Sequence, residues 1–496
     1  MNANGDVDEV TIIEALAQAA LDSGTRDPNR KQLRELSRQA MAERAGGKMS
    51  GQRVGQLRSA QDPKSPSLTE TVRLASATYL SLEQIVDRRA PLFPCERNGI
   101  AWRLSGVPQG TRPSACRIAV AQALAGESLD TIRTAVEGVY IARHQSPPAL
   151  DEVSLRDMVQ AGLDMGLARF ESPPGGAEED TCEDPELASE LARSLQYDSK
   201  ARPVNGSKHR PRVRVVKNVT HASFALDPIT PFLIARLAHR IVASHLREHP
   251  TTYYIGLAGG MHCSTFVRST GAESSPFPDD SGDKQITFVP LTLEPFWNHQ
   301  LPMADAVVGQ MVAQARALLG PRRVNGLTLQ SFGYVTHERI SRLDDAGITN
   351  VRQRYRDLDV AIFGCGDLES DGWLEQVIRR VTIDPAVRPA TDVCLNMLAE
   401  DGTSIQLSEQ REFVGISLAD IRRLVPRKDG LALLLTSGRA KGRPIVVASR
   451  AGCTDTIVCD QSAATAALEM LAQAHRVARL GPEPRAAPAA PSPRGA

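Results

Sequence analysis

The stretch LALLLTSGRAKGRPIVVASRAGCTDTIVCD, residues 431–460, decides the fold. Two short apolar runs, 431–438 and 454–460, flank a segment of helix length, 441–452. Two strands joined through a helix form a crossover connection, which is how parallel strands are linked. The stretch therefore predicts a parallel sheet with helices packed on its faces.

The same alternation extends outward over residues 213–478. Short runs rich in β-branched residues alternate there with segments whose apolar residues have helical spacing. The sequence thus predicts an α/β domain with a mostly parallel sheet covered on both faces. Besides the segments quoted above, we expect strands at 213–219, 252–260, 286–293, 359–366 and 412–417, and helices at 231–249, 303–319, 373–381, 418–425 and 461–478.

The residues on either side of this domain have other patterns. Residues 1–90 contain only short segments with helical spacing, separated by glycines, and predict an all-α helix-turn-helix bundle. Residues 91–170 predict a second small module, helical or winged-helix, in which MGLARFE (165–171) resembles a wing. Residues 171–212 combine Pro, Gly and charge blocks and predict a linker. The Pro/Ala-rich residues 479–496 predict a disordered tail.

Charge is distributed unevenly along the chain. The 58 Lys and Arg balance 58 Asp and Glu, which excludes a general polyanion binder. Residues 26–103, however, hold 15 Lys or Arg against 8 Asp or Glu, so a nucleic-acid surface is expected to be local. A chain of 496 residues is also too long for one ordinary core and predicts about two to four domains.

The cysteines and the N-terminus indicate the cellular compartment. None of the 8 cysteines falls in a C-x-x-C pair, which predicts reduced thiols rather than a disulfide framework or a zinc ribbon. The first residues, MNANGDVDEV, lack an apolar signal region. No run approaches the roughly 18 apolar residues of a membrane span. We therefore expect a cytoplasmic protein without a membrane segment.

Three glycine-bearing turns follow expected strands. The first, GLAGG at 256–260, precedes Met261 and the start of a helix. Such a turn lets backbone N–H groups approach an anion, and the helix N-terminus adds partial positive charge. A tight turn without a ligand is the alternative. The turn matches neither a Walker A loop nor the G-x-G-x-x-G dinucleotide pattern.

The second turn, TSGRAK at 436–441, places Lys441 where its ammonium would reach a phosphate beyond the strand ends, the usual ligand position in open α/β sheets. A solvated lysine at a helix start is the alternative. The third turn, FGCGD at 363–367, also follows an apolar strand. Together the three turns predict one shared pocket.

Several segments in this order resemble the SorC family of sugar-binding regulators. They are YIGLAGGMHCSTF (254–266), DVAIFGCGDLESDGWL (359–374), TDVCLNMLAEDG (391–402), QREFVGISLADIRRLV (410–425) and TSGRAKGRPIVVASRAGCTDTIVCDQSAATAAL (436–468). The resemblance covers residues 215–475 and implies a sheet related to the phosphosugar isomerases and deaminases, used as a sensor for a sugar or sugar phosphate. By position, it implies effector contacts at Gly259, Gly260, Met261, His262, Ser264, Thr265, Gly364, Gly366, Asp392 and Lys441. The family commonly has small hydroxyl residues directly after the glycines, where this chain has Met261 and His262.

A second resemblance lies in the N-terminal bundle. Residues 50–86, SGQRVGQLRSAQDPKSPSLTETVRLASATYLSLEQIV, look like the last three helices of lambda-repressor-type helix-turn-helix domains. This implies that residues 50–59 enter the major groove of DNA. The implied base or phosphate contacts are Ser50, Gln52, Arg53, Gln56 and Arg58. An ordinary polar helix face is the alternative, and residues 95–170 are the next candidate for reading DNA.

One short motif points elsewhere. HLREH at 245–249 matches the H-x-x-E-H zinc-peptidase pattern. It lies at the end of an expected helix, before Pro250, where exposed polar residues are common. We therefore expect no metal site there.

These observations leave two functional hypotheses. One is a DNA-binding regulator with a sugar or sugar-phosphate effector, operator DNA as its partner, a homodimeric or homotetrameric assembly, and neither cofactor nor metal. The other is a phosphosugar isomerase or deaminase, for which Asp367, Asp392 and Asp460 would supply carboxylates. The basic helical N-terminus favours the regulator, which predicts no enzymatic activity.

Overall fold

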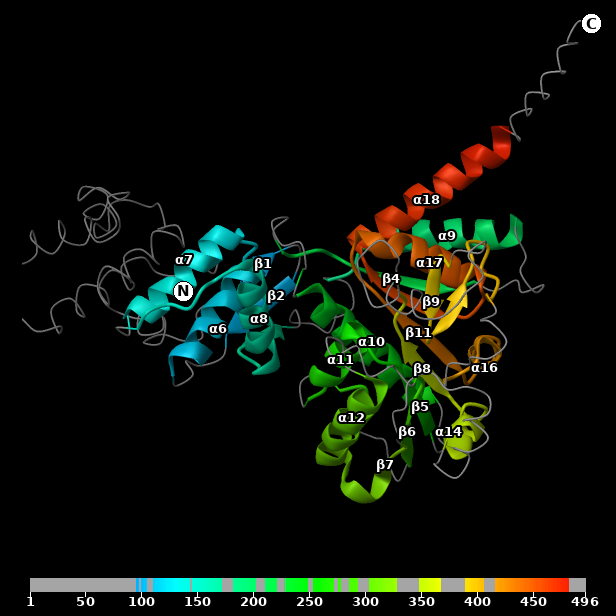
Figure 1. Ribbon diagram of the computed structural model, residues 1–496, viewed down its shortest axis with the longest axis horizontal. Helices are drawn as coiled ribbons and strands as arrows, with labels where there is room; N and C mark the ends of the chain where they lie inside the picture. Colours follow the sequence, from blue (N-terminus) through cyan, green and yellow to red (C-terminus); the bar gives the residue numbers. More distant parts are fainter. Residues whose placement is uncertain are drawn as a thin grey trace, which may run out of the picture. The chain divides into compact units, whose positions relative to one another are not determined.

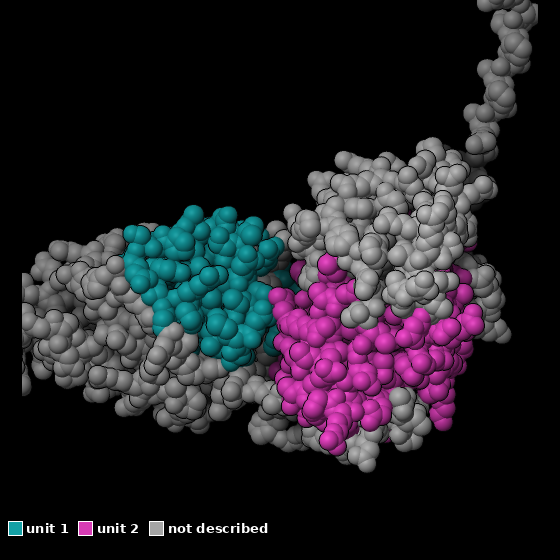
Figure 2. All heavy atoms as spheres, turned by 60° about the horizontal axis from the view of Figure 1, so that its bottom comes forward, with its two compact units in different colours: residues 1–183, 217–233 teal, residues 184–216, 234–496 magenta. Residues whose placement is uncertain are grey.

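The computed structural model of the chain describes residues 95–97, 100–104, 110–142, 145–171, 182–201, 210–220, 227, 229–248, 253–271, 275–277, 285–292, 303–327, 348–366, 389–405 and 415–480. The chain divides into two compact units, which Figure 2 shows in different colours. Unit 1 comprises Met1–Glu183 and Lys217–Leu233, and unit 2 comprises Asp184–Val216 and Ile234–Ala496. Among the described helices, none is long and apolar enough to span a bilayer.

Unit 2 is built on a seven-stranded sheet with the order β4-β12-β11-β8-β5-β6-β7. Every pairing between neighbouring strands is parallel, which confirms the predicted parallel sheet. All residues of β8, β11 and β12 are buried, so both faces of the centre of the sheet are covered. The strands are β4 (Arg212–Val216), β5 (Tyr253–Leu257), β6 (Ile286–Pro290), β7 (Val324–Gly326), β8 (Val360–Phe363), β11 (Leu431–Leu435) and β12 (Thr456–Asp460).

The helices of unit 2 pack in two groups. Helices α9, α17 and α18 contact one another near β4 and β12, whereas α11 and α12 pack together, with α12 against β5, β6 and β7 (Figure 1). The helices are α9 (Pro185–Ala201), α11 (Met261–Arg268), α12 (Ala304–Leu319), α14 (Ile348–Arg354), α16 (Leu418–Leu424), α17 (Gly442–Arg450) and α18 (Gln461–Leu480), with 3-10 turns η1 (Pro321–Arg323) and η3 (Arg439–Lys441). Helix α10 (Thr230–Glu248) begins in unit 1 and continues into unit 2 from Ile234.

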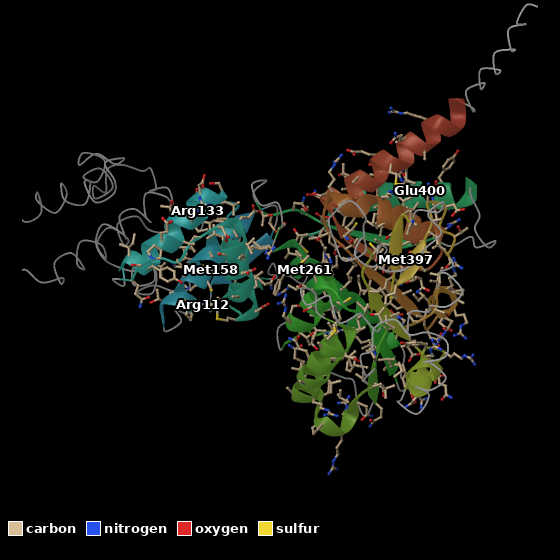
Figure 3. All side chains as sticks on the ribbon, viewed as in Figure 1. Arg112, Arg133, Met158, Met261, Met397 and Glu400 are labelled. Atoms are coloured by element: carbon tan, nitrogen blue, oxygen red, sulfur yellow. The ribbon has the colours of Figure 1, made fainter. Side chains whose placement is uncertain are left out.

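Unit 1 contains a small α and β module. Strands β1 (Cys95–Arg97), β2 (Ile100–Leu104) and β3 (Ala168–Glu171) form an antiparallel sheet, and β3 lies within the segment that resembles a wing. Helices α6 (Thr111–Leu124), α7 (Leu129–Ala142) and α8 (Glu152–Asp164) pack with α6 in contact with both others. Arg133 of α7 (labelled in Figure 3) donates to Leu150 O at 2.8 Å, and this bond connects α7 to the segment before α8.

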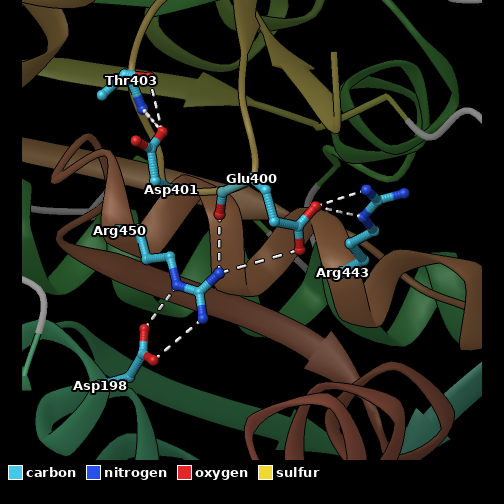
Figure 4. Close-up of polar contacts among 6 residues, drawn as sticks. All are labelled: Asp198, Glu400, Asp401, Thr403, Arg443 and Arg450. Atoms are coloured by element: carbon cyan, nitrogen blue, oxygen red, sulfur yellow. Dashed lines mark hydrogen bonds and ion pairs between the residues drawn. The ribbon is translucent and has the colours of Figure 1, made fainter. Parts of the chain in front are cut away.

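The structure corrects the predicted linker at residues 171–212. Residues 185–201 form α9, which packs against β4 and α18 and so belongs to the sheet unit. Asp198 of α9, 3% exposed, forms a bidentate pair with Arg450 of α17, 2% exposed, at 2.7 and 3.1 Å (Figure 4). A charged side chain that looks solvated in sequence is therefore buried by a partner far along the chain.

The structure also adds elements that the alternation did not predict. A hairpin of β9 (Thr391–Val393) and β10 (Asn396–Leu398) stands apart from the main sheet, and β7 extends the sheet edge. Of the expected strand at 412–417, the described part holds an isolated bridge between Gly415 and Thr292. The expected helices at 1–90 and 373–381 and the expected tail at 479–496 fall largely outside the described residues.

Candidate functional site

The candidate site lies where the strand connections change direction. From β5 the chain proceeds to β6 and β7 on one side, and from β8 it proceeds to β11 and β12 on the other. Strands β5 and β11 both pair with β8, so the carboxyl ends of these three strands are neighbours. In open α/β sheets the crevice beyond such a switch point is the usual ligand position. The glycine turns after β5, β8 and β11 all lie at this edge.

The turn after β5 exposes the start of a helix. Gly260 caps α11 with φ 92° and ψ 173°, a conformation that L side chains rarely adopt. A Cβ at this position would meet no atom within 4 Å, so the space in front of the turn is open. No side chain caps the helix start. The first N–H groups of α11 are therefore oriented for an anion or another acceptor.

The turn after β11 has the same geometry. Gly438 has φ 93° and ψ 150° and precedes η3 and α17, and a Cβ here would also meet open space. Its N–H donates to Asp460 Oδ1 at 2.9 Å, and the same oxygen accepts from Ala463 N at 3.1 Å. Asp460, at the end of β12, thus fixes this turn and the start of α18.

Two side chains connect the turns. His262 Nε2 lies 2.8 Å from Ser437 Oγ, which joins the β5 turn to the β11 turn. Lys441 Nζ donates to Cys365 O at 2.9 Å, which places the ammonium beside the end of β8. Cys365 Sγ lies 3.6 Å from Thr436 Oγ1. The three turns therefore form one connected site, and Lys441 supplies its cation.

The His262 imidazole is uncharged in the folded protein. Its removal from water lowers the pKa to about 3, and the nearby Lys441 ammonium adds to this effect. The two side chains therefore differ in chemistry: Lys441 offers a positive charge, whereas His262 and Ser437 offer neutral hydrogen-bonding groups.

The β9–β10 hairpin adjoins the end of β8. Gly366 N donates to Asp392 O at 3.2 Å, and Thr391 Oγ1 donates to Gly366 O at 2.6 Å. The turn between the strands holds Cys394 and Leu395 at φ 48° and 65°, a left-handed conformation in two successive residues that are not glycine. Each costs on the order of 1–2 kcal/mol. Such strain persists only where surrounding contacts hold it.

Two polar residues hold this turn. Asp392, 6% exposed, accepts from Leu395 N at 3.0 Å. The Asn396 amide donates to Val393 O and to Ile416 O, both at 3.0 Å. Asp392 lies beside Gly366 through its backbone oxygen, and its carboxylate binds the turn through Leu395 N.

The predicted effector residues take different positions. Gly260 and His262 on the first turn, Gly364 and Gly366 after β8, and Lys441 lie at the switch point. Met261, 47% exposed, begins α11 (Figure 3). Gly259 lies between β5 and this helix. Ser264 and Thr265 are buried, and the Thr265 hydroxyl donates to Met261 O at 2.9 Å within the helix.

Sequence reasoning did not select Ser437, Cys365 or the positioning role of Asp460. The available signal was the pair Thr436-Ser437 directly after a wholly apolar strand, since polar residues at a strand end face the crevice. Of the carboxylates suggested for an enzyme, Asp392 and Asp460 accept backbone N–H groups, and Asp367 lies outside the described residues.

Other predicted sites are not part of this arrangement. Ser50, Gln52, Arg53, Gln56 and Arg58, the predicted DNA contacts, lie outside the described residues. In the part of the chain that the structure describes, no three His, Cys, Asp or Glu side chains are placed to hold a metal. His249 of the H-x-x-E-H motif is not among those residues.

Comparison with known proteins gives matches by structure only. No protein-family model and no curated protein matches the chain. The full-length sorbitol operon regulator SorC from Klebsiella pneumoniae is similar at 15% identity and TM-score 0.43, covering 72% of this chain and 97% of that one. A transcriptional regulator from Streptococcus pneumoniae TIGR4 is similar at 18% identity and TM-score 0.41, covering 58% and 98%.

A DeoR family transcriptional regulator from Listeria monocytogenes is similar at 14% identity and TM-score 0.40, covering 56% of this chain and 98% of that one. The matched structures are thus of the kind that the sequence resembles.

Proposed function

We propose that the chain is a cytoplasmic DNA-binding transcriptional regulator whose sheet domain, residues 213–478, binds a sugar or sugar phosphate. In this proposal the effector modulates binding to operator DNA, and the protein acts as a homodimer or homotetramer. The sheet is proposed to be of the phosphosugar-isomerase type, used as a sensor and not as a catalyst.

One observation carries the effector part of the proposal: two glycine turns of the same conformation meet a lysine at the switch point of the sheet. Gly260 and Gly438 both have φ near 90°, both precede a helical turn, and both face open space. Lys441 adds a full positive charge between them. Helix N-termini and an ammonium group are the features with which proteins hold phosphate.

The carboxylates near the site favour a sensor over an enzyme. A sugar isomerase or deaminase needs an acid and a base that can approach the sugar carbons. Asp460 accepts two backbone N–H groups that fix the second turn, and Asp392 accepts one in its own hairpin. These two side chains therefore have positioning roles that support a binding site.

For the DNA-binding part, charge favours the N-terminal residues over the next candidate. Residues 95–170 hold 8 Lys or Arg against 8 Asp or Glu, and helix α8 within them is acidic, with Glu152, Asp157 and Asp164 against Arg156. Carboxylates near phosphates repel DNA, whereas residues 26–103 carry an excess of basic side chains. We therefore propose Ser50, Gln52, Arg53, Gln56 and Arg58 as the DNA contacts.

A gel-shift titration of the full-length protein with its own upstream DNA tests the proposal. We expect binding at low salt that weakens steeply as salt rises, because neutralised phosphates release counterions. Arg53→Ala and Arg58→Ala should weaken the shift, and Arg156→Ala, on α8, is the matched control. Absence of a shift at low salt, together with turnover of a sugar phosphate, would refute the regulator and support the enzyme.

Thermal unfolding with a panel of hexose and pentose monophosphates tests the effector. A ligand that binds the folded state raises the midpoint by linkage. Lys441→Met should remove this increase, and Arg443→Ala, an exposed arginine two residues later, should retain it. Equal stabilisation of the wild-type protein and Lys441→Met would exclude Lys441 from the site.

A further inference from the structure

The site holds two different kinds of hydrogen-bonding group. Lys441 is a cation, but the His262–Ser437 pair is neutral and crosses the end of β8 from the first glycine turn to the second. A second cation in place of His262 would strengthen binding to any anion. A neutral pair beside a single cation instead fits a ligand that has an uncharged polar group next to its anionic one.

We propose that His262 and Ser437 recognise a sugar hydroxyl, while Lys441 and the first N–H groups of α11 hold the phosphate. This inference rests on the proposed function and states which part of the ligand each residue contacts. His262 and Ser437 then set specificity: they distinguish a sugar phosphate from phosphate alone.

The hydrogen-bonding capacity of the pair agrees with this role. A serine hydroxyl has one donor and two acceptor sites, and a neutral imidazole has one donor and one acceptor. The single His262–Ser437 bond uses one site on each residue. A ligand hydroxyl, which both donates and accepts, matches such groups, whereas a phosphate oxygen without a proton only accepts.

The mutual bond also prepares the pair for a ligand. Each side chain holds the other in one orientation, and both are only partly exposed. Fixing the orientations before binding reduces the entropy lost when the ligand is bound. Removing either partner should therefore affect the hydroxyl part of the ligand and leave the phosphate part intact.

The test is calorimetric titration of the full-length protein with two probes, inorganic phosphate and the hexose or pentose monophosphate that most stabilises the wild-type protein. The wild-type protein should bind the sugar phosphate more tightly. In Ser437→Ala and in His262→Ala, affinity for the sugar phosphate should fall by about tenfold, the size of one lost hydrogen bond. Affinity for inorganic phosphate should stay within about twofold. Lys441→Met should lower the affinity for both probes.

Two further variants separate recognition from folding. Ser437→Thr keeps the hydroxyl and should restore most of the sugar-phosphate affinity. Arg443→Ala, on the exposed surface of α17, should behave as wild type. Thermal midpoints of the variants without ligand show whether each one is folded. His262→Leu, which fills similar space without a polar group, replaces His262→Ala if the alanine variant unfolds.

The outcomes distinguish the two proposals. If the wild-type protein binds the sugar phosphate and the His262 and Ser437 variants lose affinity for both probes equally, the pair binds the phosphate and the inference is wrong. It is also wrong if the variants bind both probes as wild type does. If the wild-type protein binds neither probe, the proposed effector class itself fails, and the inference fails with it.

Discussion

Breaking the buried pair between Asp198 and Arg450 should destabilise the sheet unit strongly. Both side chains are at most 3% exposed, and Arg450 donates to both carboxylate oxygens, at 2.7 and 3.1 Å. In Asp198→Ala the guanidinium stays buried. Of the contacts drawn in Figure 4, it keeps the hydrogen bond from Nη1 to Glu400 O at 2.8 Å and the ion pair with Glu400 Oε1 at 4.0 Å. Loss of one partner of a buried pair costs about 3–5 kcal/mol.

Urea unfolding of the full-length protein measures this cost. With an m value of about 3 kcal/mol/M, the midpoint of the sheet unit should fall by about 1 M or more. Glu469→Ala, which breaks the exposed pair with Arg439, is the control and should cost at most about 1 kcal/mol. Asp198→Leu combined with Arg450→Met removes both charges and should recover most of the loss. A cost below about 1 kcal/mol for Asp198→Ala would refute the reasoning.

Three other predictions concern glycines and histidines of the same unit. Gly309 lies at an exposed position of α12, with open space where an added Cβ would lie. Gly309→Ala should therefore raise the free energy of unfolding, measured in urea, by about 0.5–1 kcal/mol. A lower urea midpoint would contradict this. Gly260→Ala should lower the free energy of unfolding by about 1–3 kcal/mol, because φ 92° with ψ 173° is a conformation that essentially only glycine adopts, even where space is open. An unchanged midpoint would exclude this conformation. His239 and His262 both have pKa values lowered to about 3, below the ordinary value of 6.5, so unfolded chains bind protons that the folded protein does not. The free energy of unfolding is therefore highest above pH 6.5 and should fall by up to about 2 kcal/mol per histidine between pH 6.5 and 5. His262→Asn should remove the part of this fall that comes from His262. If the pH dependence of the variant matches that of the wild-type protein, the lowered pKa of His262 is contradicted.

The sequence predicts the parallel sheet because the signals are local. Runs such as LALLL at 431–435 and TIVCD at 456–460 are short, apolar and separated by a helix-length segment, and each forms a strand. The positions of the glycine turns follow from the same pattern, since parallel strands bring their carboxyl ends to one edge.

The remaining features depend on partners that are distant in sequence. Nothing near Ser437 indicates that His262 binds it, and nothing near Asp198 indicates Arg450. The β9–β10 hairpin was missed for another reason. Its turn residues, Cys394 and Leu395, are not the Gly or Asn that a left-handed turn normally requires, and contacts from Asp392 and Asn396 replace that local preference.

The pairing of β4 with β12 has a consequence for how the protein is made. Arg212–Val216 is the first strand of the main sheet to leave the ribosome, and its partner, Thr456–Asp460, is the last. The apolar residues of β4 must therefore wait for nearly the whole domain to be synthesised before they pair. During that interval β4 is unpaired and exposed to other chains. The pairing of β4 with β12 is therefore the step at which translation speed and chaperones should most affect the yield of folded protein.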